Sequence, residues 1–481
     1  MYVDPVDSDI APSGTLLGLL QRGRGDGTLH ALAAPRNEAL AALARCVCSD
    51  PRRDWRIENR SLYYARLHVE LGADLDAVEA HLFHPEDTLA EVPEERTGLA
   101  LSVLGHLVSY GDTRALHLLR RYTTTGAAWQ WALDELAVRD DDAGLVPLGP
   151  RVLARFPQSA EGEAGLAAAA KDAFEPRPWR LWEEDATRPE QGERLRKARE
   201  TVSFDRWQRQ LRANAPRPGW SVREVLAWAQ EEWTPRREAA AARCLAAVAG
   251  PADRTELLAV ARGGPDAARG AALRHLAEHA DPAVLDLLQD VADETAVSAS
   301  PPPLLESALA SFFRMRSSEA VRRARRWAAR REDALGRTAA HLLARDGGPQ
   351  DAGTVLTALR RTVRDHGADS DDLWPLVDGA GRLTIRCAAP VLRHLYRETA
   401  SSRLRGRTAR ALAATDDTFA AGFAVECLWD CEETTRELAA RYAAIGDSQV
   451  VERFRRLAAD PAEEAGVQDA VRVRLEPDGT A

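Results

Sequence analysis

The segments SSRLRGRTARALAATDDTFAAGFAVECLWD (Ser401–Asp430) and CEETTRELAARYAAIGDSQVVERFRRLAAD (Cys431–Asp460) repeat one another. They align without a gap, so that Asp417 corresponds to Asp447. Each segment joins an Ala/Arg-rich run to a second apolar run through a short turn. Self-similarity with a period of about 30 residues is typical of proteins built from stacked supersecondary units.

Each repeat predicts a pair of helices. In the second segment Leu438, Tyr442 and Ile445 recur at i, i+4 and i+7, which is one face of a helix. We expect Gly446 to end this helix, because glycine tolerates the left-handed backbone that closes a helix, and Asp447 to cap the next one. The second helix has its own apolar stripe, at Val450, Val451, Phe454 and Leu457. A pair with two stripes can bury both only against a neighbouring pair, which predicts a stack.

The same pattern recurs along the chain. Towards the other end, Leu101, Leu104 and Leu107 form an apolar stripe before the turn Gly111-Asp112. Similar units begin at Pro235 and Pro265. We expect further helix pairs at residues 127–156, 304–331, 333–366 and 373–397.

Composition also favours an all-α fold. Hydrophobic residues make up 45% of the 481 residues and aromatic residues only 6%, while Ala, Leu and Arg dominate. These three residue types lose little side-chain freedom in a helix. No stretch approaches the roughly 20 apolar residues that span a bilayer, and the N-terminus lacks the pattern of a signal peptide. Because the six cysteines show no disulfide-type spacing, we expect a soluble cytoplasmic protein with reduced, packed thiols.

In their spacing, in the Arg and Ala of the first helix and in their G-D or D-P turns, these units resemble HEAT repeats in the bacterial HEAT-like form. The resemblance covers roughly two-thirds of the chain, and the motif is degenerate. It implies a right-handed α–α superhelix, or solenoid, that binds a protein or peptide partner. A minority of HEAT-like proteins are alkylpurine DNA glycosylases or bilin lyases, so the resemblance specifies the fold better than the activity.

One segment interrupts the repeats. Residues 174–219 are rich in Pro and in charge, and the part from Glu193 to Ala213 is expected to form one long polar helix. We therefore predict an N-terminal array at residues 1–173, an insertion at 174–219 and a C-terminal array at 220–481.

Half of the 12 tryptophans lie in and just after this insertion, at Trp179, Trp182, Trp207, Trp220, Trp228 and Trp233. Trp presents a large apolar face and one N–H donor, which suits a binding surface. Trp179, Trp182 and Trp220 are therefore candidates for contact with a partner. The alternative interpretation is that the rings hold the insertion against the arrays, as buried aromatic side chains often do.

Arginines concentrate on the predicted second helix of each pair. In HEAT-like stacks these helices line the concave wall, so one inward Arg per helix would give a basic stripe for phosphates or an acidic protein surface. The alternative is a solvated charged face that acidic residues balance. The candidate contact residues are Arg322, Arg326, Trp327, Arg360, Arg361 and Arg393.

No catalytic motif, cofactor motif or metal site is expected. The sequence has no P-loop, HExxH helix, GxSxG elbow or paired CxxC clusters. The nearest metal candidate is His81 and His84, but no neighbouring His or Cys completes a set of ligands. We therefore predict a non-enzymatic scaffold. The alternative, by resemblance, is a nucleic-acid-binding protein similar to the alkylpurine DNA glycosylases, against which the formal net charge of −10 argues.

Overall fold

The computed structural model describes residues 10–51, 60–85, 94–210, 219–231, 233–295, 303–330 and 333–476, of which 94, 95, 201–210 and 295 by their backbone alone. Within these ranges every regular element is a helix and no strand occurs, which confirms the all-α class. In the same ranges, no helix combines the length and the apolar character that crossing a lipid bilayer requires.

The chain divides into two compact units. Unit 1 consists of Met1–Leu211, Tyr396–Ala413 and Asp417–Ala481, and unit 2 of Arg212–Leu395 and Ala414–Asp416. In sequence, unit 2 is thus inserted between the parts of unit 1. Most of α24 belongs to unit 2 and most of α25 to unit 1.

The helices of unit 1 are α1 (Leu16–Gln21), α2 (Gly25–Ala33), α3 (Arg36–Cys48), α4 (Arg60–Leu71), α5 (Asp76–Leu82), α6 (Glu94–Ser109), α7 (Thr113–Thr125), α8 (Trp129–Arg139), α9 (Asp142–Leu145), η1 (Val146–Leu148), α10 (Gly149–Leu153), α11 (Ala160–Asp172), α12 (Arg177–Glu183), α13 (Pro189–Gln210), α25 (Ser402–Thr415), η5 (Phe419–Ala421), α26 (Phe423–Cys427), α27 (Glu433–Tyr442), α28 (Ser448–Ala459) and α29 (Ala465–Leu475). The helices of unit 2 are α14 (Val222–Gln230), α15 (Pro235–Val248), η2 (Pro251–Asp253), α16 (Arg254–Gly263), α17 (Asp266–Glu278), α18 (Val284–Thr295), α19 (Pro303–Arg314), α20 (Ser318–Trp327), α21 (Ala334–Asp346), η3 (Pro349–Asp351), α22 (Ala352–His366), α23 (Leu373–Arg382), η4 (Arg386–Ala388) and α24 (Ala389–Glu398).

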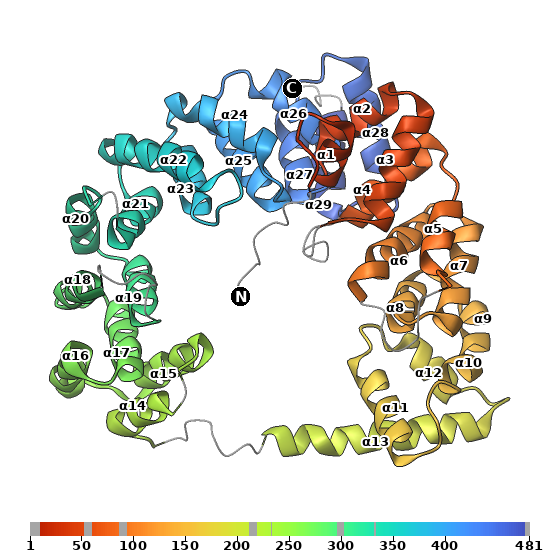
Figure 1. The fold of residues 1–481 in the computed structure, drawn as a ribbon, viewed down its shortest axis with the longest axis horizontal. Coiled ribbons are helices and arrows are strands. Elements are labelled where there is room, and N and C mark those ends of the chain that lie inside the picture. Colours follow the sequence, from red (N-terminus) through yellow and green to blue (C-terminus); the bar gives the residue numbers. More distant parts are fainter. Residues whose placement is uncertain are drawn as a thin grey trace. The chain divides into compact units, whose positions relative to one another are not determined.

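In unit 2 the helices form two rows (Figure 1). In one row α15, α17, α19, α21 and α23 contact one another in turn. In the other row α16, α18, α20 and α22 each pack against the first helix of the following hairpin. Consecutive hairpins therefore share a core. Figure 1 places this second row on the outer side of the bend of unit 2, whereas the HEAT resemblance implied that the second helices line the inner side.

The hairpin of α21 and α22 shows how the sequence forms these units. The Asp333 side chain caps α21 by accepting a hydrogen bond from the Gly336 N–H at 2.7 Å. One face of α21 buries Leu335, Ala339, Leu342 and Leu343, and α22 buries Val355 and Leu359. Each fully buried Leu stabilises the fold by about 2 kcal/mol relative to an exposed one. The pairs expected at 304–331, 333–366 and 373–397 correspond to α19–α20, α21–α22 and α23–α24.

In unit 1 one predicted stripe is confirmed and another is wrong. Leu101, Leu104 and Leu107 are buried in α6, and Gly111 ends it with a φ of +87°. In contrast, Tyr442 and Ile445 are 49% and 44% exposed, and α27 ends at Tyr442 rather than at Gly446.

The reason lies in the face that α27 buries. That face consists of Thr435, Arg436, Ala439 and Ala440. The small Ala side chains let α27 pack closely against α29, and Arg436 forms a buried ion pair with Glu463 at 2.7 Å. A pattern of apolar residues cannot identify a face that is centred on a buried arginine. On the next helix, Val450, Phe454 and Leu457 are buried as expected, and the Asp447 side chain caps α28.

Residues 174–210 of the predicted insertion belong to unit 1. α12 packs on α13, and α13 packs on α11, the last helix of the preceding array. The long polar helix expected at 193–213 is α13, whose described part ends at Gln210. The domain boundaries expected at residues 173 and 219 stay a prediction.

Helices from the early and the late parts of the sequence meet inside unit 1, where α2 contacts α26 (Figure 1). The Gly23 carbonyl accepts hydrogen bonds from the Cys431 N–H at 2.9 Å and from Arg405 at 3.2 Å. Arg405 and Asp430 form a fully buried ion pair at 2.7 Å. A Cβ on Gly25 would lie 1.8 Å from the Glu426 carbonyl oxygen, so this close approach requires glycine.

Candidate functional site

The arginine-rich helix α20 is the first candidate from the sequence. The Ser317 hydroxyl caps it by accepting a hydrogen bond from the Ala320 N–H at 3.1 Å. Ala320, Ala324 and Trp327 are buried at i, i+4 and i+7, which fixes the face that packs on unit 2. The opposite face therefore presents Arg322, Arg325 and Arg326 to solvent.

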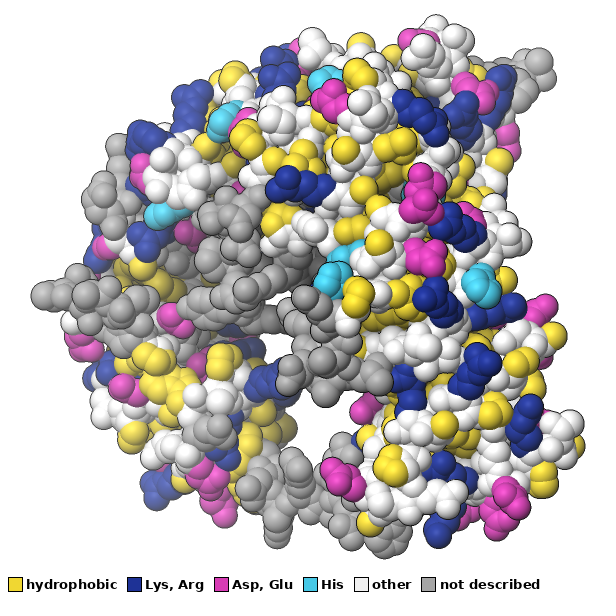
Figure 2. Space-filling view, turned by 45° about the vertical axis from the view of Figure 1, so that its right-hand side comes forward, with side chains coloured by type: hydrophobic (Ala, Val, Ile, Leu, Met, Phe, Trp, Pro, Cys, Tyr) yellow, Lys and Arg dark blue, Asp and Glu magenta, His cyan; other side chains and the backbone are white. Residues whose placement is uncertain are grey.

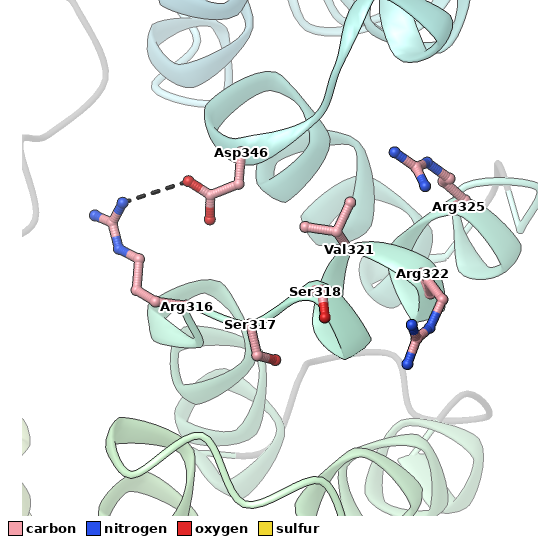
Figure 3. Close-up of a pocket in the computed structure, with 7 residues that line it drawn as sticks. All are labelled: Arg316, Ser317, Ser318, Val321, Arg322, Arg325 and Asp346. Atoms are coloured by element: carbon pink, nitrogen blue, oxygen red, sulfur yellow. Dashed lines mark hydrogen bonds and ion pairs between the residues drawn. The ribbon is translucent and has the colours of Figure 1, made fainter.

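A hollow of about 660 Å³ lies where α20 begins. Figure 3 shows Arg316 and Asp346 on one side of it, Arg322 and Arg325 on the other, and the serines at the start of α20 between them. The hollow is lined by Arg316, Ser317, Ser318, Val321, Arg322, Arg325 and Asp346. Three guanidinium groups and two hydroxyls make it suited to a ligand with carboxylate or other anionic oxygens.

The ion pairs around the hollow differ in strength. Arg316 contacts Asp346 at 3.3 Å with 71% of its side chain exposed, and Arg322 pairs with Glu319 with 64% exposed. Such exposed pairs are worth about 0–1 kcal/mol, so an incoming anion can replace them at little cost. Arg325 instead holds the buried Asp351 through two bonds, at 2.9 and 3.1 Å.

Two of the candidate arginines, Arg360 and Arg393, connect successive hairpins. Arg393 donates to Asp416 at 2.6 Å, and Arg360 donates to the Cys387 carbonyl at 3.2 Å. Arg325 and Arg254 make equivalent bonds to Asp351 and Asp281. In each case the arginine lies on a second helix and its acceptor lies in the next hairpin. Arg360 and Arg393 therefore have a structural role.

Arg326 and Arg361 differ from the others. Arg326 is exposed and Arg361 is half-buried, and neither forms a hydrogen bond or ion pair with any residue that the structure describes. Their guanidinium groups are thus not committed to holding the hairpins together.

The candidate tryptophans lie mostly in the core. Trp327 is 4% exposed, donates to Gln289 Oε1 at 3.0 Å and packs edge-on against Phe312. Trp179 and Trp182 are buried in unit 1, where Trp182 donates to the Leu145 carbonyl at 2.9 Å.

The Trp179 and Trp182 rings hold α12 against the array, as the alternative interpretation proposed. Because both rings are buried, they present no surface to a partner. Trp220 is half-buried and packs edge-on against Trp228 in unit 2. The Trp207 side chain lies outside the described residues.

Sequence reasoning missed Arg316, Ser317, Ser318 and Asp346, which complete the hollow around Arg322. Arg316 and Ser317 lie between α19 and α20, Ser318 begins α20, and Asp346 ends α21, so the four residues come from three different places in the chain. The N-cap sequence Ser317-Ser318-Glu319 marked the start of α20, but local signals do not reveal which later residue packs beside it.

The lining of the hollow combines three arginines and two serines with one carboxylate, that of Asp346, and its guanidinium groups can bind anionic oxygens. On the face in Figure 2, basic and acidic side chains intermingle over the described residues and no large area of one sign appears. Comparisons with protein-family models, with curated proteins and with solved structures found no match to this chain.

Proposed function

We propose that the chain is a non-enzymatic HEAT-like scaffold, a right-handed α–α superhelix, which binds an acidic protein or peptide through the arginines of α20 and α22. The observation that carries this proposal is that Arg326 and Arg361 have no ion-pair partner among the described residues, whereas Arg325, Arg360 and Arg393 hold hairpins together. The six free thiols support a reducing compartment such as the cytoplasm.

The geometry of α20 favours carboxylates one helical turn apart. Arg322 and Arg326 lie at i and i+4, so their Cβ atoms are about 6 Å apart on one face. A guanidinium group binds a carboxylate through two parallel hydrogen bonds, which gives direction as well as attraction. A partner segment with acidic residues on one face can contact Arg326 and reach the hollow through Arg322.

The charge balance favours a protein partner over a nucleic acid. The formal net charge of −10 opposes general attraction to a polyanion, while a local pair of unpaired arginines still attracts a local acidic patch. The nucleic-acid alternative has no structural observation of its own in its favour.

Charge reversal tests the site directly. In the double variant R326E/R361E we expect the affinity for a fluorescent Glu-rich peptide, measured by anisotropy with the full chain, to fall at least tenfold. Wild-type affinity should also fall as salt rises, because exposed charges are screened. The matched control is R223E/R455E, which changes the net charge equally at two exposed arginines on α14 and α28.

An equal loss of affinity in both double variants would mean that net charge, and not this site, drives binding. If single-stranded or duplex DNA binds the wild type with a steep salt dependence, and R326E/R361E abolishes the shift in a gel, the surface serves nucleic acid instead.

A further inference from the structure

A second cavity in unit 2 shares no lining residue with the hollow at α20. It has a volume of about 430 Å³ and opens between the α15–α16 turn and the α17–α18 turn. Gly250, Pro251 and Arg254 line one side of it, and His275, His279 and Asp281 line the other. The proposed scaffold function uses none of these residues.

Two imidazole rings meet in this cavity. His275 and His279 lie at i and i+4 on one face at the C-terminal end of α17, with ring centroids 4.3 Å apart and ring planes inclined at 43°. His275 is only 6% exposed, whereas His279 is exposed to solvent. Two His residues at this spacing on one helix can direct nitrogen atoms to a single ion.

The ring nitrogens of the two residues differ in their hydrogen bonding. Nδ1 of His279 donates to the His275 carbonyl at 2.8 Å, so its Nε2 keeps a lone pair when the ring is neutral. Nδ1 of His275 is buried and has no hydrogen-bond partner among the described residues. Burial and the neighbouring His279 lower the pKa of His275, which keeps this ring neutral at pH 7.

This arrangement is the one that metal-binding histidines adopt. A ligating imidazole almost always donates its other N–H to a carbonyl or carboxylate, which fixes the tautomer and directs the free lone pair at the metal. Here the His275 carbonyl orients the His279 ring in this way, and Nδ1 of His275 is buried beside it without a partner among the described residues. A buried ring nitrogen without a partner also destabilises the fold, and a bound ion removes that cost.

We propose that His275 Nδ1 and His279 Nε2 bind one divalent transition-metal ion in this cavity. Imidazole nitrogens suit Cu²⁺, Ni²⁺ and Zn²⁺, and Cu²⁺ binds such sites most strongly in this series. The described residues contain no group of three or more His, Cys, Asp or Glu that holds a metal, so water completes the coordination. Asp281 lines the same cavity, but Arg254 at 2.6 Å and the Ala283 N–H at 3.0 Å occupy its carboxylate.

A two-nitrogen site of this kind leaves positions open. An ion held by two protein ligands can accept a further donor from a bound molecule, as open zinc sites do. His275 and His279 match neither the HExxH pattern nor the spacing of His81 and His84, so the metal motifs considered from the sequence do not include them.

Titration of the metal-free full chain with Cu²⁺ tests the site. We expect one high-affinity equivalent by calorimetry and an electron paramagnetic resonance spectrum that shows two nitrogen ligands. The exposed position allows H279Q without disturbing the core, and this variant should bind at least tenfold more weakly and lose one nitrogen from the spectrum. In nitrogen-15 NMR spectra of the imidazole rings, we expect the addition of Zn²⁺ to shift the resonances of His275 Nδ1 and His279 Nε2.

The pair His81 and His84 supplies the matched control. His81 Nε2 already contacts the Arg96 carbonyl at 2.9 Å, and H81Q/H84Q should keep the high-affinity equivalent unchanged. The proposal is overturned if H279Q binds Cu²⁺ as the wild type does, or if H81Q/H84Q removes the high-affinity equivalent. The proposal is also overturned if the folded chain binds no Cu²⁺ ion more tightly than the urea-unfolded chain does.

Discussion

At the scale of single residues, two side chains occupy positions that suit glycine. Ala280 and Thr384 have φ values of +55° and +49° at the ends of α17 and α23. The Ala280 N–H bonds the Ala277 carbonyl at 2.9 Å, and the next N–H bonds the Leu276 carbonyl at 3.0 Å. Gly111 closes α6 with the same pair of bonds, which are the hydrogen bonds of a Schellman motif.

We expect A280G and T384G each to raise the free energy of unfolding by about 0.5–1 kcal/mol. The left-handed region costs a non-glycine residue roughly 1–2 kcal/mol, and substitution by glycine relieves this strain. The greater freedom of glycine in the unfolded chain offsets part of the stabilisation. Urea unfolding followed by circular dichroism measures the change. As the reverse control, G111A should lose about 1 kcal/mol, because open space surrounds its missing Cβ and only the backbone is strained. Unchanged urea midpoints in all three variants would show that the left-handed backbone at these positions does not strain a non-glycine residue.

At the scale of elements, the contact of α2 with α26 brings two carboxyl groups together. Asp26 pairs with Arg24, but its buried Oδ1 has no hydrogen-bond donor among the described residues. Burial and then the neighbouring Asp26 raise the pKa of Glu426 to about 7, against the opposing effect of Arg24 and Arg397. Protonated Glu426 is thus favoured where α2 meets α26.

This contact should make unit 1 less stable as the pH rises. In the unfolded chain Glu426 loses its proton near pH 4.5, but the folded chain keeps it up to about pH 7. Stability therefore decreases between these values, by at most roughly 3 kcal/mol. We expect E426Q to match the wild type at pH 5 and to exceed it at pH 8 in urea midpoints. If the urea midpoints of E426Q and the wild type changed with pH in the same way, the pKa of Glu426 would not be raised by folding.

The hairpins could be predicted from sequence because each one is encoded locally. Apolar residues at i, i+4 and i+7, Asp333 or Asp447 as a cap, and Gly111 as a stop all act within one turn of their own helix. The hollow beside Arg322 and the contact of Gly23 with Cys431 could not be predicted, because their partners come from other hairpins. Periodicity also does not tell which row of helices faces outward.

At the scale of the whole molecule, buried charges join the two ends of the sequence within unit 1. Arg66 on α4 contacts Asp460 at 2.8 Å and Glu463 at 2.9 Å, and Arg436 binds the same Glu463 at 2.7 Å. Burial alone would raise the pKa of Glu463, but Arg436 and Arg66 outweigh it and lower the pKa to about 2. This carboxylate therefore compensates two arginines at once.

Glu463 should give unit 1 an acid-labile contribution to stability. Because its folded pKa is depressed, that contribution is present above about pH 4.5 and disappears as the pH falls towards 2. E463Q at pH 7 should cost roughly 3–5 kcal/mol, since the buried Arg436 loses its counter-charge and Arg66 keeps only Asp460. Hydrogen exchange should then show lost protection in α4 and α27–α29 and unchanged protection in α17–α21. Equal loss in both sets of helices would mean that the units do not unfold separately.

The joining of distant segments in unit 1 has a consequence for biosynthesis. Arg66 leaves the ribosome 397 residues before Glu463 does. At roughly 5–20 residues per second, this delay is on the order of tens of seconds. During that time the first helices of the nascent polypeptide display apolar surface whose natural cover has not yet been translated, which makes them a target for ribosome-associated chaperones.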